Sequence, residues 1–424
     1  MRIGFMLSFF DFRNDIRRVI VEMSKLCEVV VFIRKEQVET VKKHLPENIE
    51  YRLIAERNND ILNSFLEKIF FLFRKIPKTK MNYYLMEEFK IGNIEDAKKQ
   101  NKAYALLKLH RILPHIFSYD QYLKIIRSSE KTEISDIDTF LCLTEIYDDH
   151  LFSRLIKERK KVFVYVYSWD HACKHTRFSK KVNYLVWNEG IKADLANIQQ
   201  IDSTLIQVVG ATQLGYLEEF KNSPLQVNNK TPYYYFGCGI GISSLVEKEI
   251  DVIQKLSDIL SHTKNGSKLI VRPYPNNKNW TKYKRLLQNE NIVLDDSYKQ
   301  NDLSISEADI QYKFHTISDA KGFFHLGTTL GLEACFLNCP SFIINTVPDD
   351  GNRVNIFNFV NQYQNKKYLI NASELNTINS ESQLEHIFEN IQDPNYMKLN
   401  YKIRSGFPVK SFEQISKDIF NIMK

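Results

Sequence analysis

A turn of glycine and threonine residues is the clearest candidate for binding chemistry in this sequence. Segment 322–334 reads Gly-Phe-Phe-His-Leu-Gly-Thr-Thr-Leu-Gly-Leu-Glu-Ala, and its apolar run ends at Gly327, Thr328 and Thr329. The N–H groups that begin a helix have no intrahelical partners, so they can hold an anion together with the two hydroxyls. Glu333, one helical turn later, can accept hydrogen bonds from a ribose diol. An ordinary N-cap at Thr328 explains the same pattern without a ligand.

Two further segments follow apolar runs in the same half of the chain. Arg272, Pro273 and Tyr274 follow one such run, and an arginine there can bind a phosphate through charge-assisted hydrogen bonds. Gly237 and Gly239 follow another run, where the lack of side chains lets the backbone approach a phosphate or an acceptor. Their spacing is not the Gly-x-Gly-x-x-Gly of nicotinamide sites. A rigid loop with a surface arginine, and a plain tight turn, are the alternatives.

Acidic and imidazole side chains in the first half are candidates for a general base. Asp170 and His171 come just after an apolar run, as do Glu189 and Asp11. A positioned base typically accelerates a reaction by about 10² to 10⁴. Each of these residues taken alone is more often a helix cap or a surface residue.

The elements that must position these residues are predicted by short apolar runs that alternate with helical patterns. This alternation is typical of α/β domains with parallel sheets, which bind ligands beyond the carboxyl ends of their strands. A strand at 3–9, a helix at 14–26 and a strand at 28–33 give a Rossmann-like opening. The polar, turn-rich stretch 222–230 fits a linker, and the periodicity restarts after it. We therefore expect two doubly wound domains facing a cleft.

The expected boundaries follow from that linker. They are 1–225 for an N-terminal acceptor domain, 226–405 for a C-terminal donor domain and 406–424 for a closing helix.

The composition fits a globular protein with large cores. Of 424 residues, 43% are apolar and 26% charged, and the net charge of +7 favours anionic partners. The six cysteines form no Cys-x-x-Cys pair, so a zinc site or a disulfide framework is not expected. Neither a signal peptide nor a membrane-spanning stretch is recognisable, which predicts a cytoplasmic protein. No motif interleaves basic and aromatic residues on a reading element, so nucleic acid is not an expected partner.

Two other segments have alternative interpretations. Asp136-Ile137-Asp138 mimics a metal-binding motif, yet it precedes its predicted strand instead of following it, so we interpret it as a loop. Segment 65–80 combines many apolar residues with Lys68, Arg74, Lys75, Lys78 and Lys80. It predicts peripheral contact with an anionic inner membrane, or else a helix buried in the first domain.

Several of these segments resemble the GT-B glycosyltransferases, in particular bacterial surface-carbohydrate transferases of capsule and lipopolysaccharide synthesis that carry a Ser-Trp-Asp-Asn segment. The resemblance covers roughly 163–345 and is carried by 166–171, 186–189, 208–211 and 322–341. In this chain His171 takes the fourth place of Ser-Trp-Asp-Asn. Tyr274 takes the place of a histidine, and the aspartate that often follows the Val-Gly segment is absent.

The resemblance implies a GT-B fold and a metal-independent glycosyltransferase that needs no cofactor. A nucleotide-sugar donor is then expected in the C-terminal domain, around the Gly237, Arg272 and Gly327 segments with Glu333. A surface-glycan or lipid-linked acceptor is expected in the first domain, with Asp170 or His171 as the foremost base. A nucleotide-sugar 2-epimerase or a polyol-phosphate transferase on the same fold is one alternative. A non-catalytic protein that binds nucleotides or carbohydrates is another.

Overall fold

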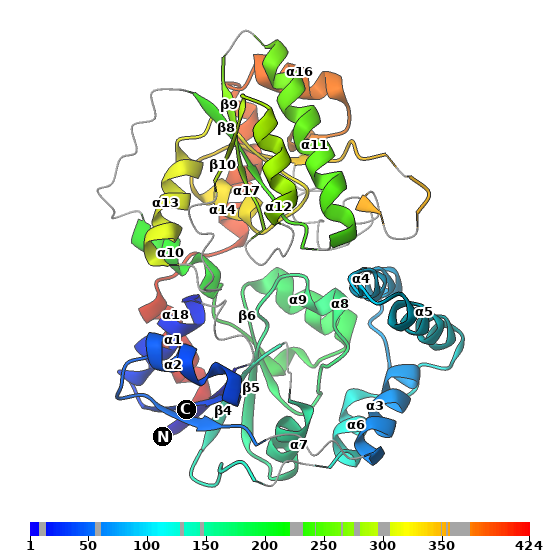
Figure 1. Ribbon diagram of the computed structural model, residues 1–424. Coiled ribbons are helices and arrows are strands. Elements are labelled where there is room, and N and C mark those ends of the chain that lie inside the picture. The colour runs from blue at the N-terminus through cyan, green and yellow to red at the C-terminus, as the bar shows by residue number, and fades with distance from the viewer. Residues whose placement is uncertain are drawn as a thin grey trace. The chain divides into compact units, whose positions relative to one another are not determined.

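The computed structural model describes residues 1–7, 14–55, 61–127, 131–144, 148–220, 232–241, 243–263, 266–274, 280–295, 306–348, 350–352, 355–356 and 374–424. The chain divides into two compact units (Figure 1). The first unit comprises Met1–Tyr83, Lys102–Glu218 and Phe407–Lys424, and the second comprises Tyr84–Asn101 and Glu219–Gly406. The boundary expected near residue 225 falls within 221–231, outside the described residues.

A parallel sheet of seven strands forms the centre of the first unit, in the order β3-β2-β1-β4-β5-β6-β7. Its strands are β1 (Arg2–Met6), β2 (Glu28–Ile33), β3 (Glu50–Leu53), β4 (Thr139–Leu143), β5 (Lys161–Tyr165), β6 (Asn183–Val186) and β7 (Ile206–Val208). The helices from the amino end to the second sheet are α1 (Asn14–Ser24), α2 (Val38–His44), α3 (Ile61–Phe73), α4 (Lys80–Gly92), α5 (Ala97–Ile112), α6 (Tyr119–Ile125), α7 (Asp149–Lys157), α8 (His171–Lys174), α9 (Glu189–Gln199) and α10 (Gly215–Phe220). The apolar central strands are buried, as a sheet covered on both faces requires.

The second unit repeats this plan with a parallel sheet of six strands, in the order β10-β9-β8-β11-β12-β13. Its strands are β8 (Tyr233–Gly237), β9 (Lys268–Arg272), β10 (Ile292–Leu294), β11 (Phe323–His325), β12 (Ser341–Ile344) and β13 (Thr377–Ile378). Its helices are α11 (Ser243–His262), α12 (Trp280–Tyr283), α13 (Glu307–Ser318), α14 (Leu330–Phe336), α16 (Glu381–Glu389) and α17 (Lys398–Gly406). Leu85 and Phe89 of α4 belong to the buried core of this unit.

The chain returns to the first unit in α18 (Phe412–Met423), which packs against α1 (Figure 1). Its Ser416 hydroxyl donates a hydrogen bond of 3.3 Å to the carbonyl of Val19. The closing segment expected at 406–424 contains this helix, which belongs to the first unit.

Both sheets contain a point at which the strand order reverses. The first strand of each sheet, β1 or β8, lies between the strand that follows it and one that comes later in the chain. The reversal lies between β1 and β4 in the first unit and between β8 and β11 in the second. In open parallel sheets, crevices for ligands form beside such points at the carboxyl ends of the strands.

Gly4 in β1 lies where a side chain would not fit. A Cβ at this position would lie 2.7 Å from the ring of Phe140 and 2.9 Å from that of Phe32. We expect Gly4→Ala to lower the free energy of unfolding by about 1–3 kcal/mol, because a packed core resists an added methyl group. Gly406→Ala is the control, since a Cβ there has no atom of the described structure within 4 Å. Urea unfolding of both variants measures the difference, and equal stabilities would contradict the packing.

Candidate functional site

Three of the predicted binding segments meet at the carboxyl ends of β8, β9 and β11. A Cβ on Gly239 would lie 3.0 Å from Cβ of Thr328, and a Cβ on Gly241 would lie 3.1 Å from Cε1 of Tyr274. Gly239, Thr328 and Thr329 are half-buried, whereas Gly241 and Tyr274 are exposed. We call these five residues the β8–β11 edge. It lies at the strand-order reversal of the second unit, where such folds bind ligands.

The Gly-Thr-Thr turn is built on a buried histidine. The N–H of Gly327 donates a hydrogen bond of 2.8 Å to Nδ1 of His325, so a neutral imidazole carries its proton on Nε2, which lies 3.3 Å from the hydroxyl of Ser341. A Cβ on Gly331 would overlap this ring, so only glycine fits there. Gly327 itself has φ +95°, a conformation that favours glycine. The Gly327 N–H therefore points towards this buried ring, and the half-buried Thr328 and Thr329 follow it in the turn.

Arg272 lies inside the second unit. It is 2% exposed, and its guanidinium donates a hydrogen bond of 2.6 Å to the carboxylate of Asp295, which also accepts one from the hydroxyl of Tyr235. Pro273, the next residue, is buried too. A buried ion pair is costly to separate, because each partner left alone is an uncompensated charge. Phosphate binding by Arg272 stays a prediction. It requires that a phosphate replace Asp295 as the partner of the guanidinium, or that both anions bind the guanidinium together.

Glu333 on α14 forms a second ion pair, with Lys313 on α13. The Nζ of Lys313 lies 2.6 Å from Oε2 of Glu333, and Glu333 is 8% exposed. Burial lowers the pKa of Lys313, and the nearby charge of Arg272 lowers it further, while Glu333 and Asp295 act in the opposite direction. The pair fixes the direction of the Glu333 carboxylate. The role of Glu333 as a ribose ligand stays a prediction.

Sequence reasoning missed Glu249, which lies beneath the glycine loop. Its Oε1 accepts a hydrogen bond of 3.0 Å from the N–H of Gly239 and its Oε2 one of 2.7 Å from the hydroxyl of Tyr283. The signal was present in the sequence, because Glu249 interrupts the buried apolar stripe of α11. The ion partners Asp295 and Lys313 were missed as well.

In the first unit, Asp170 and His171 lie at the start of α8. The carboxylate of Asp170 accepts hydrogen bonds of 2.6 Å from the hydroxyl of Ser168 and 2.8 Å from Nζ of Lys174. Burial raises the pKa of Asp170, but the charge of Lys174 and these two hydrogen bonds outweigh it, so the pKa lies below its ordinary value. Nδ1 of His171 lies 2.8 Å from the hydroxyl of Thr144. Both residues are buried, at 8% and 2% exposure.

The other two candidate bases lie elsewhere. Glu189 is an exposed residue in the first turn of α9, where an acidic side chain stabilises the helix, and Asn188 before it caps the N–H of Ile191 at 2.9 Å. Asp11 lies outside the described residues. Catalytic roles for Glu189 and Asp11 stay predictions.

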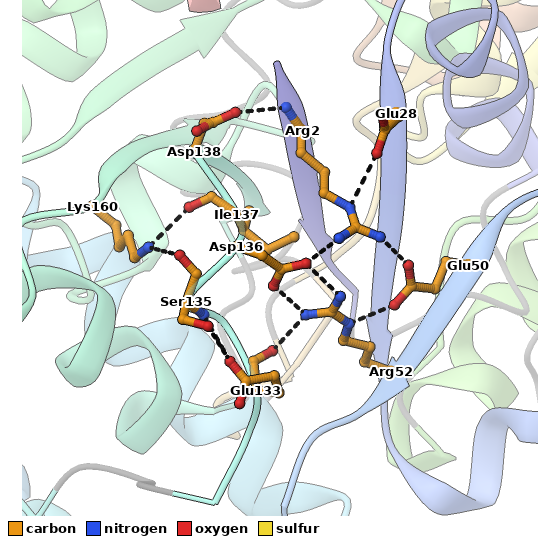
Figure 2. A network of polar contacts seen from close by, with 10 residues as sticks. All are labelled: Arg2, Glu28, Glu50, Arg52, Glu133, Ser135, Asp136, Ile137, Asp138 and Lys160. Carbon is orange, nitrogen blue, oxygen red and sulfur yellow. Dashed lines mark hydrogen bonds and ion pairs between the residues drawn. The ribbon is translucent and has the colours of Figure 1, made fainter.

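The Asp136-Ile137-Asp138 triplet precedes β4, as interpreted from the sequence, and forms part of a network of ion pairs. Figure 2 shows Asp136 between Arg2 and Arg52, with Asp138 accepting a hydrogen bond of 2.8 Å from the backbone N–H of Arg2. The hydrogen bonds from Arg52 lower the pKa of Asp136 to about 2. These carboxylates tie β1, β3 and β4 together. Across the described ranges, no cluster of histidine, cysteine and acidic side chains has the arrangement of a metal site.

The Arg272–Asp295 pair gives a test of what holds the second unit together. We expect Asp295→Ala to lower the free energy of unfolding by about 3–5 kcal/mol, because it leaves a buried guanidinium without its counterion. Asp251→Ala is the matched control, since Asp251 pairs with Arg285 at the surface and such pairs contribute less than about 1 kcal/mol. Denaturant unfolding measures both. A similar small loss in the two variants would show that Arg272 does not depend on Asp295.

No family model matches the sequence, and no curated protein matches it either. Solved structures do resemble it. The UDP-GlcNAc 2-epimerase from Methanocaldococcus jannaschii has a TM-score of 0.51 and 11% identity, over 100% of this chain and 99% of that one. The enzyme from Neisseria meningitidis bound to UDP-GlcNAc has a TM-score of 0.51 and 12% identity, over 99% of each chain. That from Rickettsia bellii has a TM-score of 0.52 and 11% identity, over 100% of this chain and 95% of the other. The likeness confirms the two-domain α/β fold of the GT-B type.

Proposed function

We propose that this protein is a metal-independent glycosyltransferase that binds a nucleotide sugar at the β8–β11 edge and transfers the sugar to an acceptor. The observation that carries the proposal is the meeting of the glycine loop after β8 with the Gly-Thr-Thr turn after β11. The shared fold supports it, because one of the similar structures is bound to UDP-GlcNAc. Enzymes of two doubly wound domains can stabilise a leaving phosphate with protein groups in place of a metal.

Four residues of this edge, together with Glu333 and Arg272 beside it, have roles in the proposal. The hydroxyls of Thr328 and Thr329 donate hydrogen bonds to the phosphates, and Gly239 leaves room for them. Glu333 keeps Oε2 on Lys313 and offers Oε1 to the ribose. Tyr274, 37% exposed, covers the nucleotide or the sugar with its ring. Arg272 contributes charge from beneath, and much of that charge is offset by Asp295.

The first unit supplies the acceptor side. Of the two foremost candidate bases, His171 is better suited than Asp170, because accepting a proton would cost Asp170 its ion pair with Lys174. If neither acts, the leaving phosphate itself receives the acceptor proton. The acceptor is a surface glycan or a lipid-linked sugar.

A nucleotide-sugar 2-epimerase is the second candidate, because the similar structures described above carry that name. The two activities differ in their products. An epimerase converts UDP-GlcNAc into its 2-epimer without an acceptor, whereas a transferase releases the nucleotide only when an acceptor is present. Proton NMR of the protein with UDP-GlcNAc, with and without candidate acceptors, separates them. Epimer formation without acceptor would replace the transferase proposal.

We expect Glu333→Gln to weaken binding of the nucleotide by about tenfold or more, because a charge-assisted hydrogen bond to the ribose contributes about 1.5–3 kcal/mol. Glu385→Gln, an exposed position on α16 of the same unit, is the control. Titration calorimetry with UDP, GDP and CMP, preceded by a thermal-shift screen, measures the affinities. Equal affinity in both variants would remove Glu333 from the site, and no stabilisation by any nucleotide would overturn the proposed function.

We also propose that the protein works on the cytoplasmic face of an anionic membrane. Large apolar side chains are exposed on α3, on α5 and around α6, including Ile61 at 89% and Ile112 at 80%. These helices contact one another, since Phe70 of α3 stacks on Tyr122 of α6 at 4.3 Å and His110 of α5 lies 2.8 Å from the carbonyl of Leu72. Exposed basic residues accompany them, namely Lys68, Lys75, Lys108, Arg111 and Lys124. Among the described residues, no helix is both long and apolar enough to cross a bilayer.

We expect the double change Ile61→Ser and Phe65→Ser to reduce binding to phosphatidylglycerol vesicles at least about tenfold, because each exposed apolar side chain gains about 1.5–3 kcal/mol on burial. Leu287→Ser, which removes a side chain 54% exposed in the second unit, is the control. Vesicle co-sedimentation measures both. Wild-type binding that is absent, or equal on neutral phosphatidylcholine vesicles, would contradict membrane contact.

A further inference from the structure

Glu249 holds the glycine loop from inside the second unit. Its side chain is fully buried, and its two oxygens accept hydrogen bonds from the Gly239 N–H at 3.0 Å and from the Tyr283 hydroxyl at 2.7 Å. The N–H of Ile240 and the thiol of Cys238 add hydrogen bonds to the same carboxylate. Three consecutive residues of the loop thus converge on one carboxyl group. The loop N–H groups that could have faced a phosphate face Glu249 instead.

The described residues around this carboxyl group include no basic partner for it. Within the described residues, no ion pair includes Glu249, and the titratable groups that face it are Tyr283 from α12 and the thiol of Cys238, both acids. Charged groups on the elements packed against α11 pair elsewhere: Lys282 and Arg285 with Glu247, Arg285 also with Asp251, Lys255 with Glu381, and Arg272 with Asp295. Burial therefore dominates and raises the pKa of Glu249 to about 7, against the opposing effect of its hydrogen bonds. Near neutral pH the group exists in both protonation states.

In the proposed site, a phosphate at the β8–β11 edge would lie on the far side of Gly239 from this carboxyl group. Two negative charges separated by little more than the loop backbone repel each other strongly where water is excluded. The anion then favours the protonated form of the group beneath it. By linkage, protonation of that group favours the anion to the same extent.

We propose that Glu249 is the positioning residue of the glycine loop and that binding of a nucleoside-diphosphate sugar at the β8–β11 edge is coupled to proton uptake by its carboxylate, by less than one proton per site near neutral pH. The proton comes from the buffer and goes to a carboxylate oxygen, and the Tyr283 hydroxyl can turn to accept from the new O–H. Gly239 keeps its N–H bond to Oε1. The inference rests on the proposed donor site. Because deprotonation of Glu249 places a negative charge beneath the donor phosphates, affinity for the donor falls as the pH rises through neutrality.

The same group also links folding to pH. Because its folded-state pKa lies above the ordinary value of 4.5, its contribution to stability is fully present below about pH 4.5 and is lost as the pH rises towards 7. Glu249→Gln removes this loss. Between pH 4.5 and 8 we expect the unfolding equilibrium constant of wild type to rise by up to about 100-fold relative to that of Glu249→Gln.

The test uses UDP-GlcNAc as the probe, because its phosphodiester groups do not titrate between pH 6 and 8. For wild type we expect affinity to fall about three- to tenfold from pH 6 to pH 8, and calorimetry in buffers of different ionisation enthalpy to report proton uptake. Glu249→Gln should bind with little pH dependence and without proton uptake. Glu247→Gln, a half-buried position on the same helix whose carboxylate pairs with Lys282 and Arg285, should behave as wild type.

The outcomes separate the two proposals. Binding by wild type without proton uptake, or a pH dependence retained in Glu249→Gln, would overturn the role of Glu249 and leave the donor site standing. Failure of wild type to bind UDP-GlcNAc at any pH would overturn the donor site proposed for this probe and the inference with it. If Glu249→Gln does not fold, the calorimetry of wild type alone tests the proposal. The absence of proton uptake on binding of UDP-GlcNAc to wild type would then overturn it.

Discussion

Close approach of backbone segments at the β8–β11 edge depends on positions that carry no Cβ. At Gly237 a Cβ would overlap the ring of Phe323, and at Gly331 it would overlap the ring of His325. At Gly239 it would press on Thr328. Three pieces of the second unit therefore meet where ordinary side chains would hold them apart. The threonine hydroxyls, the exposed tyrosine and the buried carboxylates around this edge have their places because of that contact.

Charge in the second unit is arranged beneath the surface of the site. Arg272 with Asp295 and Lys313 with Glu333 are buried ion pairs, and Glu249 is a buried acid held by neutral donors. Such groups are expensive to bury, so each is hydrogen-bonded. The surface presents hydroxyl groups, glycines and an aromatic ring, while the fixed charges act on it from below.

The sequence was sufficient for the architecture. Alternating apolar runs predicted two parallel sheets, and the resemblance to GT-B enzymes implied that the Gly237, Arg272 and Gly327 segments surround one donor. The structure brings the residues around Gly239, Tyr274 and Thr328 together. The sequence was not sufficient for the partners of the charged residues. Asp295 is 23 positions from Arg272, and Glu249 is 10 positions from Gly239. Such pairings depend on how helices and strands pack, which no local pattern records, and so Arg272 looked like a surface ligand.

The packing of α18 against α1 has a consequence for synthesis on the ribosome. In the order of translation α1 precedes the second unit, yet the helix that covers it follows that whole unit. During that interval the apolar residues of α1, such as Val19 and Met23, lack part of their cover. The second unit, apart from the segment 84–101, is continuous in sequence and can fold as it emerges. Until α18 is translated, the first unit therefore exposes part of the surface of α1, and a fragment that stops at residue 218 would expose it permanently.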